Sequence, residues 1–322
     1  MPSSTPTDTE AWIITGPTSG IGRRTALELA KHGTVVLVGR NRTKLDDVEH
    51  EIRAQGGRAV SVVADLSDIT SARRAAAEIV ALGLPIAGLL NSAGAAPTRP
   101  GTTAQGWDTT YATNHLGPFA LTEALIPHLP DGAHVVFVCS GVEDPERRPA
   151  VVAGFRGARY ISAEASARGE WAPGGSSVAG ADAYATSKQG NLATVLALAR
   201  ELPRLRVNAV EPGFNPGTDL GRDANVALRV LSRYVLSPIA PLIKYWSNPK
   251  RAARVITTIL TDDSDRTGVY YDETGRPMLG SVQVRDQAFQ DRVVAETRAL
   301  LATVPVGATG DRPGTSGRPP RG

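Results

Sequence analysis

The chain has 322 residues, 41% of them hydrophobic and 21% charged, which is typical of one large or two modest globular domains with a sizeable core. Its formal charge of +3 gives no sign of a basic face for binding nucleic acid. Cys139 is the only cysteine, which excludes an intrachain disulfide and a metal site built from cysteines.

The five histidines show no metal-ligand spacing, so we expect no metal site. The first residues, MPSSTPTDTE, lack the charged and apolar regions of a signal peptide. We expect no membrane span, because the chain has no apolar run of about eighteen residues or more. Together these observations favour a cytoplasmic protein.

Short apolar runs alternate with segments of helical spacing along most of the chain. Strands are expected at 11–15, 34–39, 58–66, 85–94, 133–140, 205–212 and 268–272. Helices are expected between them at about 19–33, 42–57, 71–83, 107–129 and 182–202. Such alternation predicts parallel βαβ units.

The predicted fold class is therefore α/β, with a Rossmann-type doubly wound parallel sheet of about seven strands and helices on both faces. Right-handed crossovers would place three helices on each face. We expect a single domain over 11–302, a disordered lead-in over 1–10 and a disordered tail over 303–322. An insertion rich in Gly, Pro and Arg at 141–183 and amphipathic helices at 219–248 interrupt the alternation.

The segment TGPTSGIG, residues 15–22, joins the first strand to the first helix and carries three glycines. Such a turn brings backbone N–H groups and the helix N-terminus against a pyrophosphate. Tight strand-to-helix turns also use glycine for steric reasons, but the position in the first βαβ unit favours dinucleotide binding. The expected cofactor contacts are Thr15, Gly16, Ser19, Gly20, Ile21 and Gly22.

The end of the second strand distinguishes NAD from NADP. NAD-selective sites place Asp or Glu there for the ribose 2′-hydroxyl, whereas NADP sites favour a cation for the 2′-phosphate. Here the strand ends in Arg40, and Arg23 follows the glycine turn directly. These arginines are either solvated side chains or ligands of the phosphate. We predict NADP(H) in preference to NAD(H).

Tyr184 and Lys188 are four positions apart in YATSK, so on a helix their Cβ atoms lie about 5–6 Å apart. An ammonium about 4 Å from a phenol oxygen would favour the phenolate by about 4 kcal/mol. That would bring the tyrosine pKa from ~10 towards ~7, where the phenol can exchange a proton with a carbonyl or an alcohol. Two polar side chains on a helix surface are the alternative interpretation.

Seven motifs in order make the chain resemble the short-chain dehydrogenases/reductases over roughly residues 11 to 300. They are TGPTSGIG, Asp65-Leu66, NSAG at 91–94, Asn114 in TNHLGPFALT, Ser140 in FVCSG, YATSK, and Pro212-Gly213 with Thr218. TNHLGPF and EPGFNPGTDL look most like the retinol-dehydrogenase-like branch. The chain also resembles light-dependent protochlorophyllide reductases.

The resemblance implies that Tyr184 is the general acid/base and that Lys188 lowers its pKa and holds the nicotinamide ribose. Ser140 would fix the substrate oxygen, and Asn114 would anchor a water that relays protons through Lys188. The remaining cofactor contacts implied by the family are Asp65 and Leu66 at the adenine, Asn91, Ala93 and Gly94 along the cofactor, and Pro212, Gly213 and Thr218 by the carboxamide and diphosphate.

The chain departs from the family pattern in three places. Ser92 stands where NNAG is commoner, and Cys139 stands where a serine is frequent. We expect Cys139 to be a small buried side chain rather than a redox group. Ser140 and Tyr184 are 44 positions apart (184 − 140), far more than in compact members. Within this insertion, Tyr160 and Trp171 either line the entrance or staple a long loop.

Residues 219–248 are predicted to form an apolar lid over a bulky, lipophilic substrate. Alternatively they pack on the domain or a partner subunit, or, least favoured, lie on a membrane surface. Relatives often pair through the helices that carry Asn114 and Tyr184, so a homodimer or homotetramer is compatible with the sequence.

The predicted function is an NADP(H)-dependent oxidoreductase that interconverts a carbonyl and an alcohol. One alternative is the reduction of an activated C=C bond. The other is a non-catalytic NADP(H)-binding sensor or scaffold, against which the four intact residues Asn114, Ser140, Tyr184 and Lys188 argue.

Overall fold

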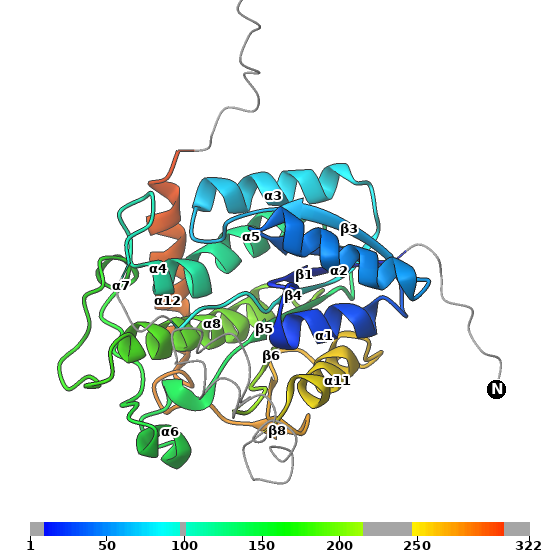
Figure 1. Ribbon diagram of the computed structural model, residues 1–322. Helices are drawn as coiled ribbons and strands as arrows, with labels where there is room; N and C mark the ends of the chain where they lie inside the picture. The colour runs from blue at the N-terminus through cyan, green and yellow to red at the C-terminus, as the bar shows by residue number, and fades with distance from the viewer. Residues whose placement is uncertain (1–9, 97–100, 215–246, 306–322) are drawn as a thin grey trace, which may run out of the picture.

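The computed structural model describes residues 10–96, 101–214 and 247–305. Within them the chain forms an eight-stranded sheet of order β3-β2-β1-β4-β5-β6-β7-β8 (Figure 1). The strands are β1 (Ala11–Thr15), β2 (Thr34–Gly39), β3 (Arg58–Val63), β4 (Ile86–Asn91), β5 (His134–Val138), β6 (Arg206–Val210), β7 (Tyr270–Tyr271) and β8 (Pro277–Met278).

The predicted fold class is confirmed, and all seven predicted strands are present in parallel pairing. The eighth strand, β8, is an addition that pairs antiparallel with β7. It has only two residues, Pro277 and Met278, which is too short for an alternating pattern to appear in the sequence.

The centre of the sheet explains where a ligand can bind. All five residues of β1 are buried, as expected for a parallel strand covered on both faces. Ile14 of β1 lies between Leu37 of β2 and Leu90 of β4. The strand order reverses between β1 and β4, and such a switch point opens a crevice at the carboxyl ends of the strands.

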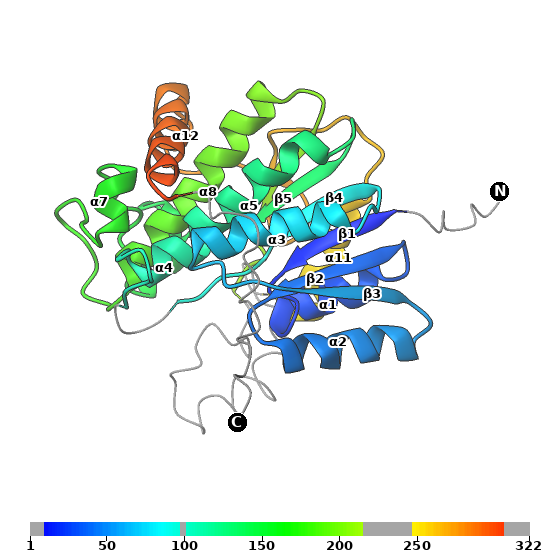
Figure 2. The same cartoon turned by 90° about the horizontal axis from the view of Figure 1, so that it is seen from above.

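Helices cover both faces of the sheet (Figure 2). One face carries α1 (Gly20–Leu29), α2 (Arg42–Ala54) and α11 (Pro249–Leu260), and the other carries α3 (Ile69–Ala81), α5 (Gly117–Leu125) and α8 (Ala181–Glu201). The expected three helices on each face are therefore present. A further helix, α12 (Gln287–Ala302), packs outside the second layer against α8.

The predicted helix at 107–129 is present but is not regular. It consists of α4 (Thr109–Tyr111), a π-helical turn η1 (Ala112–Leu116), α5 and a 3₁₀ turn η2 (Ile126–His128). The π-helical turn contains Asn114. Single π-turns inside α-helices occur frequently at functional sites, so this irregularity marks the segment for closer inspection.

The insertion at 141–183 folds into a 3₁₀ turn η3 (Gly141–Glu143) and two short helices, α6 (Arg148–Val152) and α7 (Ala163–Ala167). It is anchored to α12: the Tyr160 phenol donates to Glu296 Oε2 (2.7 Å), and so does the Ala163 N–H (3.0 Å). The Tyr160 ring also packs edge-on against Phe289, with 5.5 Å between centroids. Of the two interpretations of Tyr160, the structural one is therefore favoured: Tyr160 holds the insertion against α12.

Several predictions lie outside the described residues: nearly all of the lid at 219–248, residue Thr218, the lead-in over 1–9, and the tail from 306 onwards. Among the described helices, none is long and apolar enough to cross a bilayer. The described residues also contain no group of three or more His, Cys, Asp or Glu side chains placed to hold a metal ion.

Candidate active site

The glycine turn after β1 is packed so closely that side chains are excluded. Gly16 has φ of +69°, and a Cβ there would lie 2.8 Å from Cα of Ala93. A Cβ on Gly22 would lie 2.3 Å from the Gly16 carbonyl oxygen. Both distances are too short for carbon: glycine at 16 lets the turn after β1 approach the loop after β4, and glycine at 22 lets α1 pack against that turn.

Helix α1 begins directly after this turn, and its N-terminus suits an anion. Ser19 precedes the helix with extended backbone, and its side chain makes no capping hydrogen bond. The first turn contains no acidic residue. The first backbone N–H groups of the helix therefore keep their partial positive charge, and the residues present fit the pyrophosphate of a dinucleotide.

Two predicted cofactor residues have structural roles. Thr15 Oγ1 accepts hydrogen bonds from the N–H groups of Ser92 and Ala93 (both 3.0 Å), so it ties the end of β1 to the loop after β4. Asn91 Nδ2 donates to Thr122 Oγ1 (2.9 Å). The Asn91 Oδ1 atom is buried and has no hydrogen-bond partner among the described residues, so it remains available to a ligand.

The two arginines near the second strand differ. Arg40, just after β2, is exposed and forms no ion pair within the described residues. Arg23 instead donates to Glu51 Oε2 of α2 through Nε (2.9 Å) and Nη2 (2.6 Å). Arg23 is thus already neutralised by a carboxylate, which the sequence alone did not indicate.

The predicted adenine contacts follow β3. Asp65 Oδ1 accepts from the N–H (2.9 Å) and the hydroxyl (2.8 Å) of Ser67, which shapes the loop. Leu66 is buried, and a Cβ on Gly117 would lie 1.9 Å from its carbonyl oxygen, so α5 packs directly on this loop.

Another predicted cofactor residue, Gly213, follows β6. It has φ of +73°, which few residues other than glycine adopt.

Tyr184, Ser140 and Lys188 meet at the carboxyl end of β5. Tyr184 and Lys188 lie one turn apart on α8, and Ser140 follows β5 directly. Ser140 lies near enough to the Tyr184 phenol to lower its pKa, against the larger effect of burial. Lys188 Nζ lies 5.5 Å from the centroid of the Tyr184 ring and donates to the Val138 carbonyl (2.8 Å). The structure therefore brings these three predicted residues together.

The expected lowering of the Tyr184 pKa is wrong for the protein as it stands. Burial raises the pKa of Tyr184 to about 12, and Ser140 offsets this only in part. Burial likewise lowers the pKa of Lys188. Desolvation of the buried phenol is the largest cause, and the Lys188 ammonium donates to the Val138 backbone carbonyl.

Asn114 is held rigidly beside the same lysine. Its Oδ1 accepts from the Ala95 N–H and its Nδ2 donates to the Ala95 carbonyl, both at 2.8 Å. Its own carbonyl accepts from Asn191 Nδ2 (2.9 Å). A Cβ on Gly94 would lie 3.5 Å from Asn114 Oδ1 and 3.7 Å from Lys188 Nζ. Asn114, Gly94 and Lys188 are therefore neighbours, as the family resemblance implies.

Three charged residues around the site were not found from the sequence: Glu143 and Glu211 are buried, and Arg147 is partly buried. Glu211, directly after β6, pairs with Arg147 of the insertion (2.6 Å). Glu143, in the 3₁₀ turn that follows Ser140, accepts from the N–H (2.8 Å) and the hydroxyl (2.6 Å) of Ser281. Burial raises the pKa of Glu143 to about 7. Glu211 could have been found from its place at the end of a predicted strand, directly before Pro212. Glu143 and Arg147 could not, because they stand in a segment without strand or helix periodicity.

Cys139 is buried, as expected, and burial raises the pKa of its thiol to about 12. The thiol is therefore protonated near neutral pH and is a poor nucleophile. Its place at the end of β5, under Ser140, is that of a small core side chain.

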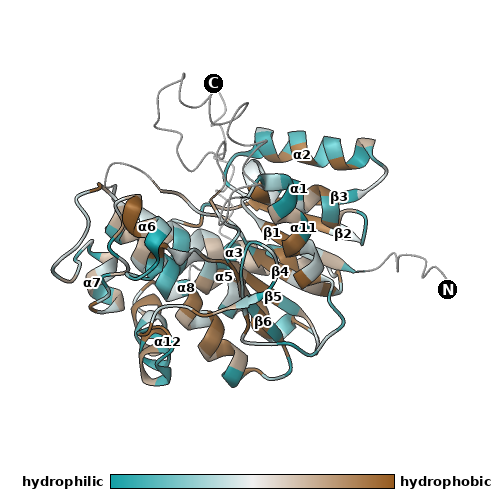
Figure 3. Cartoon of the chain, turned by 90° about the horizontal axis from the view of Figure 1, so that it is seen from below, coloured by the Kyte–Doolittle hydropathy of each residue, from teal (hydrophilic) through white to brown (hydrophobic). Residues whose placement is uncertain are grey.

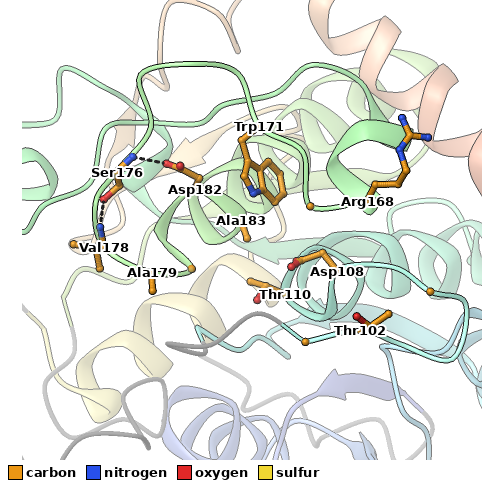
Figure 4. A pocket seen from close by; sticks show the side chains of 14 residues that line it. Thr102, Asp108, Thr110, Arg168, Trp171, Ser176, Val178, Ala179, Asp182 and Ala183 are labelled. Atoms are coloured by element: carbon orange, nitrogen blue, oxygen red, sulfur yellow. Dashed lines mark hydrogen bonds between the residues drawn. The ribbon is translucent and has the colours of Figure 1, made fainter.

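A cavity of about 320 Å³ lies between the first turn of α8, the start of α4 and the insertion. Trp171, Asp108, Ser176, Asp182 and Ala183 line part of it (Figure 4). Trp171 therefore lines a cavity beside the helix of Tyr184, whereas Tyr160 is a structural staple.

Comparison with known proteins agrees with the geometry. A family profile described as short chain dehydrogenase matches residues 10–151. The chain is 31% identical to polyprenol dehydrogenase of Mus musculus, over 88% of this chain and 81% of that protein. It is 27% identical to human retinol dehydrogenase 13, over 90% of this chain and 83% of that protein.

Solved structures share the fold. A protein from Mycobacterium paratuberculosis is 25% identical with a TM-score of 0.66, over 91% of this chain and 93% of that chain. A short chain dehydrogenase from Burkholderia cenocepacia, solved in complex with NADP, is 22% identical with a TM-score of 0.60, over 84% and 98% of the respective chains. From its sequence relatives and its fold, the chain belongs to the short-chain dehydrogenase/reductase family of oxidoreductases, which use a nicotinamide cofactor.

Proposed function

We propose that the protein is an NADP(H)-dependent oxidoreductase that interconverts a carbonyl and an alcohol on a lipophilic small molecule, with Tyr184 as general acid/base. The observation that carries the proposal is the meeting of Ser140, Tyr184 and Lys188 at the carboxyl end of β5, with Lys188 Nζ 5.5 Å from the centroid of the Tyr184 ring. Two relatives are named for polyprenol and retinol, and both names denote lipophilic alcohols.

When bound, the nicotinamide cofactor supplies or takes up a hydride. The chain supplies the remaining chemistry. The Ser140 hydroxyl donates a hydrogen bond to the carbonyl oxygen, and the Tyr184 phenol gives that oxygen its proton. A phenol with a pKa of about 12 is protonated near neutral pH, so it carries the proton that carbonyl reduction requires. The Lys188 ammonium then stabilises the phenolate that remains.

The activity is tested by oxidation of NADPH, with NADH in parallel, against lipophilic and small carbonyl compounds. Formation of an alcohol with NADPH supports the proposal. A saturated ketone formed from an unsaturated one would instead identify a C=C reductase. Tight NADPH binding without turnover of any carbonyl would favour the sensor.

The NADP preference rests on Arg40, which is exposed after β2 and not paired with a carboxylate among the described residues. We expect Arg40→Ser to raise the Kd of NADPH about tenfold to a hundredfold, because it removes a charge-assisted hydrogen bond to the 2′-phosphate. The Kd of NADH should change less than about twofold. Both are measured by nicotinamide fluorescence on the purified protein.

The matched control is Arg42→Ser. It removes the same charge two positions further along the chain, from an arginine that is paired with Asp46 (3.0 Å). It should leave the ratio of the two dissociation constants unchanged. An equal loss of NADPH and NADH affinity in Arg40→Ser would show that Arg40 does not read the 2′-phosphate.

A further inference from the structure

The insertion is fastened to the first turn of α8, the helix that carries Tyr184 (Figure 4). The Ser176 N–H donates to Asp182 Oδ1 (2.9 Å). The Ser176 hydroxyl donates to the Gly154 carbonyl (2.6 Å) and accepts from the Val178 N–H (3.0 Å). One serine thus links α8 to the segment that follows α6.

The backbone at position 154 requires glycine. Its φ is +92°, and a Cβ there would lie 2.8 Å from Cγ2 of Val178. The next residue, Phe155, is held by its N–H, which donates to the Ala150 carbonyl (3.0 Å). Both groups of the peptide unit before Phe155 are therefore hydrogen-bonded, which fixes the backbone from which its side chain leaves.

The fastened segment places Phe155 next to the proposed acid. The centroids of the Phe155 and Tyr184 rings are 6.3 Å apart, and the ring planes are inclined at 53°. Phe119, Phe137 and Phe289 are buried in the core, whereas Phe155 is partly exposed. An aromatic ring that is accessible and adjacent to Tyr184 is placed to contact a ligand rather than to fill the core.

We propose that Phe155 is a specificity-determining residue, which selects carbonyl substrates with a planar, unsaturated group attached to the carbonyl carbon. This inference rests on the proposed function. Ser140 and Tyr184 bind the carbonyl oxygen, so a substituent of the carbonyl carbon extends away from them. Phe155 offers it an aromatic partner, and aromatic rings attract each other in offset or edge-on arrangements at centroid separations of about 4.5–7 Å.

The experiment compares two probes that differ in ring unsaturation alone, phenyl methyl ketone and cyclohexyl methyl ketone. The measured quantity is the ratio of their kcat/KM values with NADPH. In Phe155→Leu, which keeps an apolar side chain, the phenyl/cyclohexyl ratio should fall about fivefold. Phe155→Ala should lower it at least as much. Ser176→Ala, which releases Gly154, should lower it by a smaller factor.

Val152→Ala is the matched control, because Val152 lies in α6 of the same insertion and is 89% exposed (α6 is labelled in Figure 3). It should leave the ratio unchanged. The Kd of NADPH and the thermal unfolding midpoint, measured for every variant, identify any variant that has lost its fold. Phe155→Leu provides the test if Phe155→Ala does not fold.

The outcomes separate the inference from the proposed function. If the unmodified enzyme reduces both ketones and the ratio is the same in Phe155→Leu, the role of Phe155 is overturned and the carbonyl reductase function stands. If the unmodified enzyme binds NADPH but reduces neither these ketones nor any other carbonyl, both are overturned together. A selective fall in the ratio with unchanged NADPH affinity supports both.

Discussion

Replacing Tyr184 with phenylalanine is expected to lower kcat for carbonyl reduction by about 10²–10⁴-fold, the usual contribution of a general acid. The variant keeps the ring, and with it the contacts to Phe155 and Lys188, but loses the phenol oxygen. The Kd of NADPH should change less than about threefold. Steady-state NADPH oxidation and fluorescence titration of the cofactor measure the two quantities.

Tyr271→Phe is the matched control, because it makes the same chemical change at a buried tyrosine of β7 that packs with α11 on the opposite face of the sheet. It should retain normal turnover. If Tyr184→Phe also retained normal turnover, Tyr184 would not be the acid and the mechanism proposed above would be wrong.

The second large effect concerns stability and pH. Glu143 is fully buried, and burial raises its pKa from the ordinary value of 4.5 to about 7. Because the folded-state pKa is the higher one, protonated Glu143 contributes stability that is complete below about pH 4.5 and is lost as the pH rises through about 7. A pKa difference of this size corresponds to a change of at most about 3 kcal/mol in the free energy of unfolding.

We therefore expect Glu143→Gln to increase the free energy of unfolding by about 2–3 kcal/mol at pH 8 and by almost nothing at pH 4.5. An amide keeps the shape of the protonated acid and can still bond to Ser281, but it cannot ionise. Chemical denaturation at the two pH values measures the difference. Glu78→Gln, on the exposed face of α3, serves as control and should show no pH-dependent change.

An equal stability difference for Glu143→Gln at both pH values would mean that the carboxyl does not change its charge between them. A loss of stability at pH 8 would mean that the ionised carboxylate makes stabilising contacts that an amide cannot replace.

The sequence predicted the sheet well because parallel strands covered on both faces are almost purely apolar, as in β1, β2 and β4. The glycine turn was also predictable, since close backbone approach leaves glycine as the only choice at Gly16 and Gly22. Helix α11 was missed although it carries ordinary signals, namely a capping Asn248 followed by Pro249.

The electrostatics of the site could not be predicted from the sequence, because they depend on partners that are distant along the chain. Arg23 pairs with a glutamate 28 positions later, and Glu143 bonds to a serine 138 positions later. Burial raises the pKa of Tyr184, and spacing on a helix does not reveal that Lys188 reaches the Val138 carbonyl. Local patterns therefore identified Arg23, Tyr184 and Lys188 but not their partners, and they did not identify Glu143.

The anchor between the insertion and α12 has a consequence for synthesis on the ribosome. Glu296 holds Ala163 from 133 positions further along the chain. The sheet can assemble as soon as its strands emerge, but the segment beside Tyr184 cannot reach its final contacts until α12 has left the exit tunnel. The segment beside Tyr184 therefore completes its contacts only after strands β1 to β6 have emerged.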